Sequence, residues 1–247
     1  MSENTLELAL RRQELTKQEG YNLWETVTKQ VEVPISDTAL LICDAWDRHW
    51  CRGARERLDR MLGRMNDVVG SCRDRGMQII HSPSGTMAFY TDHPARERMA
   101  EYPSAGPPEN LEHDDPPLPV DASDDGSDTE EDEPAQVWTR QHPAIEIDQS
   151  LDIISDNGEE IYSLFQHKGV DKLLIMGVHT NMCVLHRSFG IKQMIRWGIH
   201  VALIRDLTDT MYNPAMPPYV SHEEGTRLVI EFIEKFWCPT IGSEDLL

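Results

Sequence analysis

The chain has 247 residues, of which 39% are hydrophobic, enough for one α/β domain with a large buried core. Its 43 acidic and 23 basic residues give a net charge of −20, which argues against nucleic-acid binding, because phosphate recognition depends on clustered Lys and Arg. No apolar stretch is long enough to span a membrane, and the first residues lack the pattern of a secretory signal. The five cysteines do not have the spacing of metal-binding pairs, which suggests a reducing compartment. We therefore expect a cytoplasmic protein.

Residues 1–37 are interpreted as an N-terminal extension with a short helix and a turn at Pro34, packed on the domain or on a partner subunit. The domain itself, residues 38–247, opens with the apolar run 38–43, which is typical of a buried strand in a parallel sheet. Apolar residues at helical spacing predict a helix from Leu58 to Cys72, and a strand is predicted over 77–81.

The connection over about 82–134 is a long insertion. Its acidic part, residues 121–133, is predicted to be disordered because like charges repel in a compact loop, although its oxygen-rich composition leaves calcium binding as an alternative. Its first half carries enough apolar residues to form a lid. The histidines and acids at His81, Asp92 and His93 lack the spacing of a metal motif, and no metal site is predicted.

The remaining pattern alternates strands and helices. It predicts strands over 135–140, 172–176 and 200–205 and helices over 151–167, 184–197 and 223–236. Repeated βα units indicate a three-layer α-β-α sandwich around a mainly parallel, Rossmann-like sheet of about six strands.

Two of these strands end in chemically useful side chains. Asp44 follows the first strand, and Cys183 stands where the strand 172–176 gives way to a helix. In open α/β sheets ligands bind beyond the carboxyl ends of the strands. The first N–H groups of a helix have no internal partner, so they lower the pKa of a thiol and stabilise an oxyanion. Asp44 and Cys183 are therefore a candidate base and nucleophile, although a cysteine in such a chain is also commonly a small buried hydrophobe.

With these residues in place, the chain resembles the isochorismatase-like cysteine hydrolases, which include nicotinamidases and N-carbamoyl amide hydrolases. The resemblance runs from about residue 38 to 235 and is strongest in the turn Gly177–Val184. It implies a catalytic Asp44 and Cys183, a cis peptide before His179, and an oxyanion hole formed by the backbone N–H groups of His179 and Cys183.

The resemblance also implies a lysine at the end of the intervening strand, where this chain has Arg140. A guanidinium stays protonated at physiological pH, so Arg140 cannot transfer a proton. It is a candidate to hold Asp44, to stabilise a Cys183 thiolate or to receive an anionic substrate; a structural salt bridge at the strand end is the alternative.

Aromatic, imidazole and amide groups near the expected mouth of the site are candidate substrate-binding residues. They are Trp46, His49, His142, Asn181 and Tyr212. Packing in the core or between subunits is the alternative for the tryptophan.

We therefore expect a homo-oligomeric cysteine hydrolase of a small carbonyl compound, acting on an amide or carbamoyl C–N bond without a cofactor. Fold resemblance alone does not fix the bond, because the family also contains hydrolases that cleave a vinyl ether. A non-catalytic small-molecule-binding or interaction protein is the alternative, and the arginine at position 140 is its support.

Overall fold

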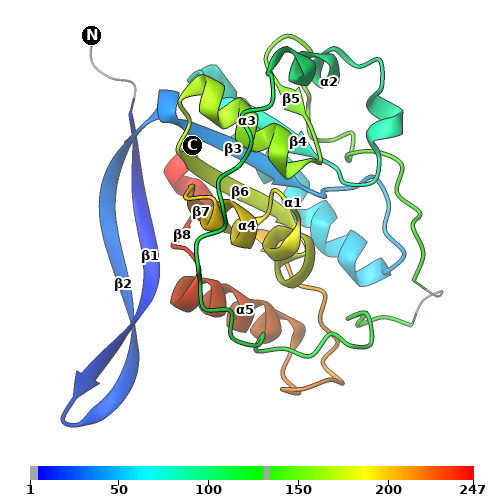
Figure 1. The fold of residues 1–247 in the computed structure, drawn as a ribbon. Helices are drawn as coiled ribbons and strands as arrows, with labels where there is room; N and C mark the ends of the chain where they lie inside the picture. Colours follow the sequence, from blue (N-terminus) through cyan, green and yellow to red (C-terminus); the bar gives the residue numbers. More distant parts are fainter. Residues whose placement is uncertain (1–4, 131–133) are drawn as a thin grey trace.

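A computed structural model describes residues 5–130 and 134–247. Within these residues the chain forms one eight-stranded sheet in the order β2-β1-β8-β7-β6-β3-β4-β5, flanked by helices (Figure 1). Six neighbouring strands, from β8 to β5, are parallel, and β1 and β2 add an antiparallel hairpin at one edge. The predicted α/β sandwich with its mainly parallel sheet is confirmed, and the hairpin enlarges it by two strands.

Apolar runs of the sequence coincide with the parallel strands β3, β4 and β6, whereas β1 and β2 mix polar and apolar residues; the eight strands have the following bounds. They are β1 Thr5–Gln18, β2 Tyr21–Pro34, β3 Thr38–Cys43, β4 Gln78–Ser82, β5 Ile153–Ile154, β6 Lys172–Val178, β7 His200–Asp209 and β8 Thr240–Ile241. The parallel strands β3, β4 and β6 are almost fully buried because helices cover both faces of the sheet.

The helices divide between the two faces of the sheet. Their bounds are α1 Arg52–Asp74, α2 Pro94–Glu97, α3 Gly158–Lys168, α4 Ile191–Arg196 and α5 His222–Phe236, with short turns η1 Ile35–Asp37, η2 Met87–Tyr90, η3 Arg98–Glu101, η4 Thr180–Val184 and η5 Ser243–Leu246. Successive side chains of β3 point to opposite faces of the sheet and so contribute to two different apolar cores. One core lies against α3, α4 and α5, and the other against α1 and η5.

Three predicted elements differ from the structure. No strand forms over 135–140. The strand beside β4 is instead Ile153–Ile154, and the predicted helix 151–167 begins later because this strand occupies its first residues. The predicted helix 184–197 is interrupted and resumes only at Ile191. The interruption lies where Gly190 approaches the main chain, since a Cβ on Gly190 would lie 2.8 Å from the carbonyl oxygen of Val184.

The N-terminal extension is a β-hairpin instead of a short helix. Its two 14-residue strands stand at one side of the body, where only Arg11 is paired with β8, at Thr240 (Figure 1). Glu19 and Gly20 connect the strands with φ values of 49° and 89°, the left-handed conformation that a two-residue hairpin turn requires. This X-Gly turn between two β-prone runs is the signal that the helix prediction overlooked.

The acidic insertion also differs from expectation, because residues 121–130 pack against the body instead of being disordered. Asp121 donates a backbone hydrogen bond to Pro217, and Gly126 lies so close to Met211 that a Cβ would be 2.5 Å from its carbonyl oxygen. Residues 131–133 lie outside the described residues. We call residues 121–130 the acidic strap.

Across the part of the chain that the structure describes, no helix has both the length and the apolar character needed to cross a membrane.

Candidate active site

The carboxyl ends of β3 and β6 bring the candidate acid and thiol together. The two strands are parallel neighbours, with Cys43 opposite Gly177 in the register. Gly177 has a φ of 121°, and a Cβ there would lie 1.9 Å from the carbonyl oxygen of Cys43. Only glycine therefore allows the turn after β6 to begin beside Asp44.

Asp44 is fully buried and has a left-handed φ of 48°, which few residues other than Asn, Asp and Gly adopt. One carboxylate oxygen accepts a hydrogen bond of 2.6 Å from the backbone N–H of Ser84. The other accepts a hydrogen bond from Nε of Arg187, 3.1 Å away. Burial raises the pKa of Asp44 despite the opposing effects of Arg187, Cys183 and Ser84, which makes the carboxylate a better base than an exposed one.

The Cys183 thiol lies close enough to Asp44, Arg187 and the backbone of His179 for all three to act on its pKa. It is partly exposed, whereas the other four cysteines are buried. Burial, with the Asp44 charge, raises the pKa of Cys183 to about 12, opposite to the lowering expected from a helix N-terminus. At neutral pH the Cys183 side chain is therefore a thiol.

The cation beside this pair is Arg187, which sequence analysis did not single out. Its backbone N–H donates to the carbonyl of Cys183 at 3.0 Å, one helical turn earlier, so the two side chains share a face. The spacing of four residues was the available signal.

The structure places Arg140 elsewhere. It is exposed, its guanidinium lies 5.4 Å from the ring centroid of Phe89, and its backbone N–H donates to Asp47. The expectation that Arg140 completes the site is corrected, because the predicted strand 135–140 that would aim it at Asp44 does not form.

The peptide bond between Val178 and His179 is cis, as the family resemblance implied. His179 is buried, and burial together with neighbouring His49 lowers the pKa of its imidazole to about 3. The ring is therefore neutral at physiological pH.

A cavity of about 180 Å³ opens beside this site. It is bordered by Asp44 and His179, and not by Cys183; three candidate substrate-binding residues, Trp46, His49 and His142, also line it. Burial and nearby Arg55 lower the pKa of His49 to about 4. The imidazoles of His49 and His179 are thus uncharged at neutral pH, although the exposed residues Arg48, Arg55 and Asp59 bring charge to the mouth of the cavity.

Aromatic rings form a stack along this cavity. Trp46 and Trp138 have ring centroids 4.1 Å apart, and the His49 ring stacks 5.8 Å from Trp138 and 5.5 Å from Trp50. Trp138 belongs to the irregular segment after the insertion, and nothing in its sequence context indicated this position.

The structure assigns packing roles to the other two candidates. The amide of Asn181 both donates to and accepts from the backbone of Met211, at 2.9 and 3.0 Å. Tyr212 is fully buried, and its hydroxyl donates to the carbonyl of Met216 and accepts from the N–H of Val220. Both side chains hold the loop after β7 and offer nothing to a substrate.

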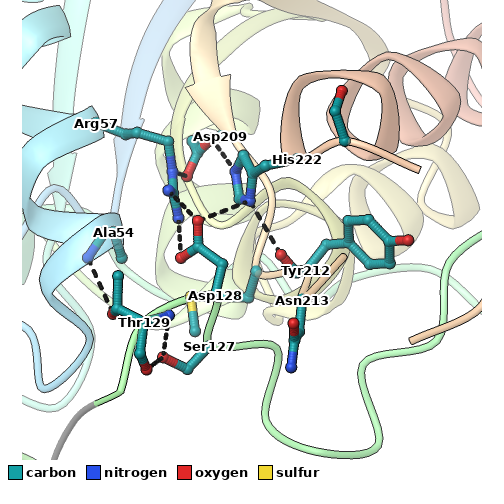
Figure 2. A network of polar contacts seen from close by, with 12 residues as sticks. Ala54, Arg57, Ser127, Asp128, Thr129, Asp209, Tyr212, Asn213 and His222 are labelled. Atoms are coloured by element: carbon teal, nitrogen blue, oxygen red, sulfur yellow. Dashed lines mark hydrogen bonds and ion pairs between the residues drawn. The ribbon is translucent and has the colours of Figure 1, made fainter. Parts of the chain in front are cut away.

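The acidic strap is fixed to the body by a network of four charged groups (Figure 2). Arg57 binds Asp128 at 2.6 Å and Asp209 at 2.8 Å. His222 faces Asp209 through Nε2 at 2.9 Å and the carbonyl of Tyr212 through Nδ1 at 3.0 Å. Both ring nitrogens face oxygen atoms, an arrangement that favours the protonated ring. Burial lowers the pKa of His222, but the hydrogen bond and charge of Asp209 outweigh it and raise the pKa.

We expect Asp128→Asn to lower the free energy of unfolding by about 2 kcal/mol, because it leaves a partly buried Arg57 and His222 with one carboxylate fewer. Asp125→Asn is the matched control, since Asp125 is exposed on the same strap. Urea unfolding followed by circular dichroism measures both. Equal stability of the two variants would contradict a packed strap.

Within residues 5–130 and 134–247, no three His, Cys, Asp or Glu side chains are grouped so that they could hold a metal ion. His81 is buried between Gln141 and Asp152, at 2.9 and 3.0 Å.

At the carboxyl ends of parallel strands, a buried acid, a thiol and the cation of Arg187 form one cysteine site on an α/β sheet. The isochorismatase domain model matches residues 38–215, and the chain belongs to that family. No curated protein matches the sequence.

Solved structures share the fold. A cysteine hydrolase from Pseudomonas syringae pv. phaseolicola 1448A is 14% identical with a TM-score of 0.58, covering 87% of this chain and 92% of that one. An isochorismatase from Pseudomonas putida KT2440 is 13% identical with a TM-score of 0.54, covering 86% and 91%. At these identities the likeness concerns the fold alone.

Proposed function

We propose that the chain is a cysteine-dependent hydrolase of a small carbonyl compound and cleaves an amide or carbamoyl C–N bond. Asp44 takes the proton of Cys183 while the sulfur attacks the carbonyl carbon, and the backbone N–H groups of His179 and Cys183 bind the resulting oxyanion. The C–N bond then breaks, and Asp44 returns the proton to the leaving nitrogen. Water, deprotonated by Asp44, cleaves the thioester and regenerates the thiol.

The observation that carries this proposal is the buried carboxylate of Asp44 between the Cys183 thiol and the Arg187 guanidinium. A buried acid with a raised pKa is suited to take a proton at neutral pH. The thiol supplies the proton, and the fixed positive charge of Arg187 keeps the carboxylate ionised between the two transfers. Arg187 is a positioning residue, because it acts through Asp44.

The size and lining of the cavity support a small, flat and largely uncharged substrate. A volume of about 180 Å³ is below that of sites for drug-sized ligands, which begin at roughly 300 Å³. Trp46 and His49 provide ring faces and neutral nitrogen atoms, which suit a planar amide or ureide better than a branched or multiply charged molecule. We propose that this cavity receives the body of the substrate.

The binding-protein alternative rested on the loss of the family lysine at Arg140. Arg187 supplies a cation to Asp44 from another element, so the change at position 140 no longer favours a non-catalytic protein.

The proposal is tested by incubating the pure protein with simple amides, ureides, carbamoyl acids and a vinyl ether, and by measuring release of ammonia or alcohol. We expect C–N cleavage in at least one of the first three classes, with a Cys183 acyl adduct trapped at low pH and seen by mass spectrometry. Turnover of the vinyl ether alone, or turnover that leaves no adduct and survives loss of Cys183, would overturn it.

Replacing Arg187 tests the positioning role. Arg187→Met should lower turnover about 100-fold and raise the Cys183 pKa further, because Arg187 lowers that pKa through its charge. Arg187→Lys should recover part of the loss. Arg140→Met is the control and should remain within about twofold of the parent. Turnover and the pH dependence of thiol alkylation measure both effects; equal losses in the Met variants would refute the assignment.

A further inference from the structure

Among residues 5–130 and 134–247, no strand pairs with the outer edge of β2, the outermost strand of the sheet. β2 is last in the strand order, and it pairs with β1 over 14 successive residues without a register shift. Proteins commonly block such edges with proline, bulges or several lysines, because an open edge pairs with another strand. Within β2 the proline stands only at the last position, 34, and Lys29 is its one basic residue.

The hairpin also exposes apolar side chains, and its net charge is close to zero although the whole chain is strongly acidic. Large side chains on β2 are exposed, with Tyr21 at 72% and Trp24 and Leu23 at 43% each. Residues 5–34 carry four basic and five acidic residues, whereas the whole chain has 23 and 43. Two copies of a protein with a charge of −20 repel each other least through a segment of this kind.

The sequence of β2 is complementary to itself when two copies run antiparallel with Val27 opposite Val27 of a second copy. In that register each Glu25 faces a Lys29, Leu23 faces Val31, and Thr26 faces Thr28. Facing residues in antiparallel strands lie side by side on one face of the sheet, where opposite charges and apolar pairs stabilise the pairing.

Neighbouring registers lack this match. Centring the pair on Glu25 or on Lys29 places like charges opposite each other, which is destabilising. Centring the pair on Thr26 places Glu25 opposite Val27, and centring it on Thr28 places Glu25 opposite Val31. In both registers Glu25 and Lys29 each face an uncharged residue. The side chains thus select one register.

We propose that two copies of this chain dimerise by pairing their β2 strands antiparallel about Val27, joining the two sheets into one. The arrangement is a closed two-fold dimer, in which the same edge serves both partners. It satisfies the unpaired backbone groups of β2 and places the two Glu25–Lys29 pairs symmetrically about the axis.

A charge exchange tests this register. Sedimentation equilibrium should show a dimer for the parent; Glu25→Lys and Lys29→Glu should each weaken the dimer about tenfold, and the double variant should restore it to within about threefold. Glu32→Lys is the matched control. In the proposed register Glu32 faces the neutral Asn22 of the second copy, so this change should have little effect on the dimer. A monomeric parent at 100 μM, or a double variant as weak as the singles, would overturn the proposal.

Cross-linking provides a second readout that does not depend on charge. Under mild oxidation Val27→Cys should form a covalent dimer through facing cysteines, whereas Thr28→Cys, which faces Thr26, should cross-link at least tenfold more slowly. Circular dichroism confirms that each variant is folded. Equal cross-linking of the two variants, or of neither, would exclude pairing about Val27.

Discussion

Replacing Cys183 with alanine is expected to abolish turnover, with a fall of at least about 10⁴-fold, because no other group among the described residues combines a nucleophilic sulfur with contact to Asp44. The fold should survive, since the side chain is small and partly exposed. Ammonia release on the identified substrate measures the loss. Cys72→Ala, which removes a sulfur buried on α1, is the control and should retain activity.

Alkylation adds a kinetic check on the same residue. Iodoacetamide should modify Cys183 before the four buried cysteines, and the rate should rise about tenfold per pH unit up to pH 9.5, because the thiol pKa is about 12. A rate that levels off near neutral pH would show a resting thiolate and contradict the thiol–carboxylate pair.

Replacing Asp44 with asparagine should depress turnover by roughly 10³-fold to 10⁴-fold, because the thiol loses its base. The backbone should tolerate the change, since asparagine is isosteric and adopts the left-handed conformation that Asp44 has. The thiol pKa should fall, because the Asp44 charge and hydrogen bond raise it, so alkylation of Cys183 should become faster.

Slower turnover together with faster alkylation distinguishes a base from a residue that only maintains the structure of the site. A structural defect would slow turnover without making the alkylation of Cys183 faster. Asp206→Asn is the matched control, because Asp206 lies on β7 and binds Ser243 at 2.6 Å, away from the thiol. Undiminished turnover in Asp44→Asn would remove this acid from the mechanism.

Local patterns determined the parallel sheet and the positions of the acid and the thiol. A buried parallel strand reads as a continuous apolar run, so 38–43 and 172–176 were recognisable without any tertiary information. Strand ends of one sheet edge meet in space, and this placed Asp44 and Cys183 together before any distance was known. Helix α5 was predicted as 223–236 and forms from His222 to Phe236 for the same reason: its apolar face repeats at helical spacing.

Elements stabilised by distant partners were not readable in this way. The short strand Ile153–Ile154 is defined by pairing with β4, and the acidic strap is ordered because Asp128 meets Arg57 and His222. A charge run looks disordered when its countercharges lie far away in the sequence.

The sequence by itself determined the fold class and placed Asp44 and Cys183 at strand ends, because both follow from apolar periodicity. Only the tertiary structure decided which cation lies beside Asp44: Nε of Arg187 is 3.1 Å from its carboxylate, whereas the Arg140 guanidinium lies 5.4 Å from the ring centroid of Phe89. It also decided the pKa of the thiol. The pKa of Cys183 is raised because burial and the Asp44 carboxylate outweigh the lowering by Arg187 and by the backbone of His179, and desolvation depends on the neighbours that folding assembles.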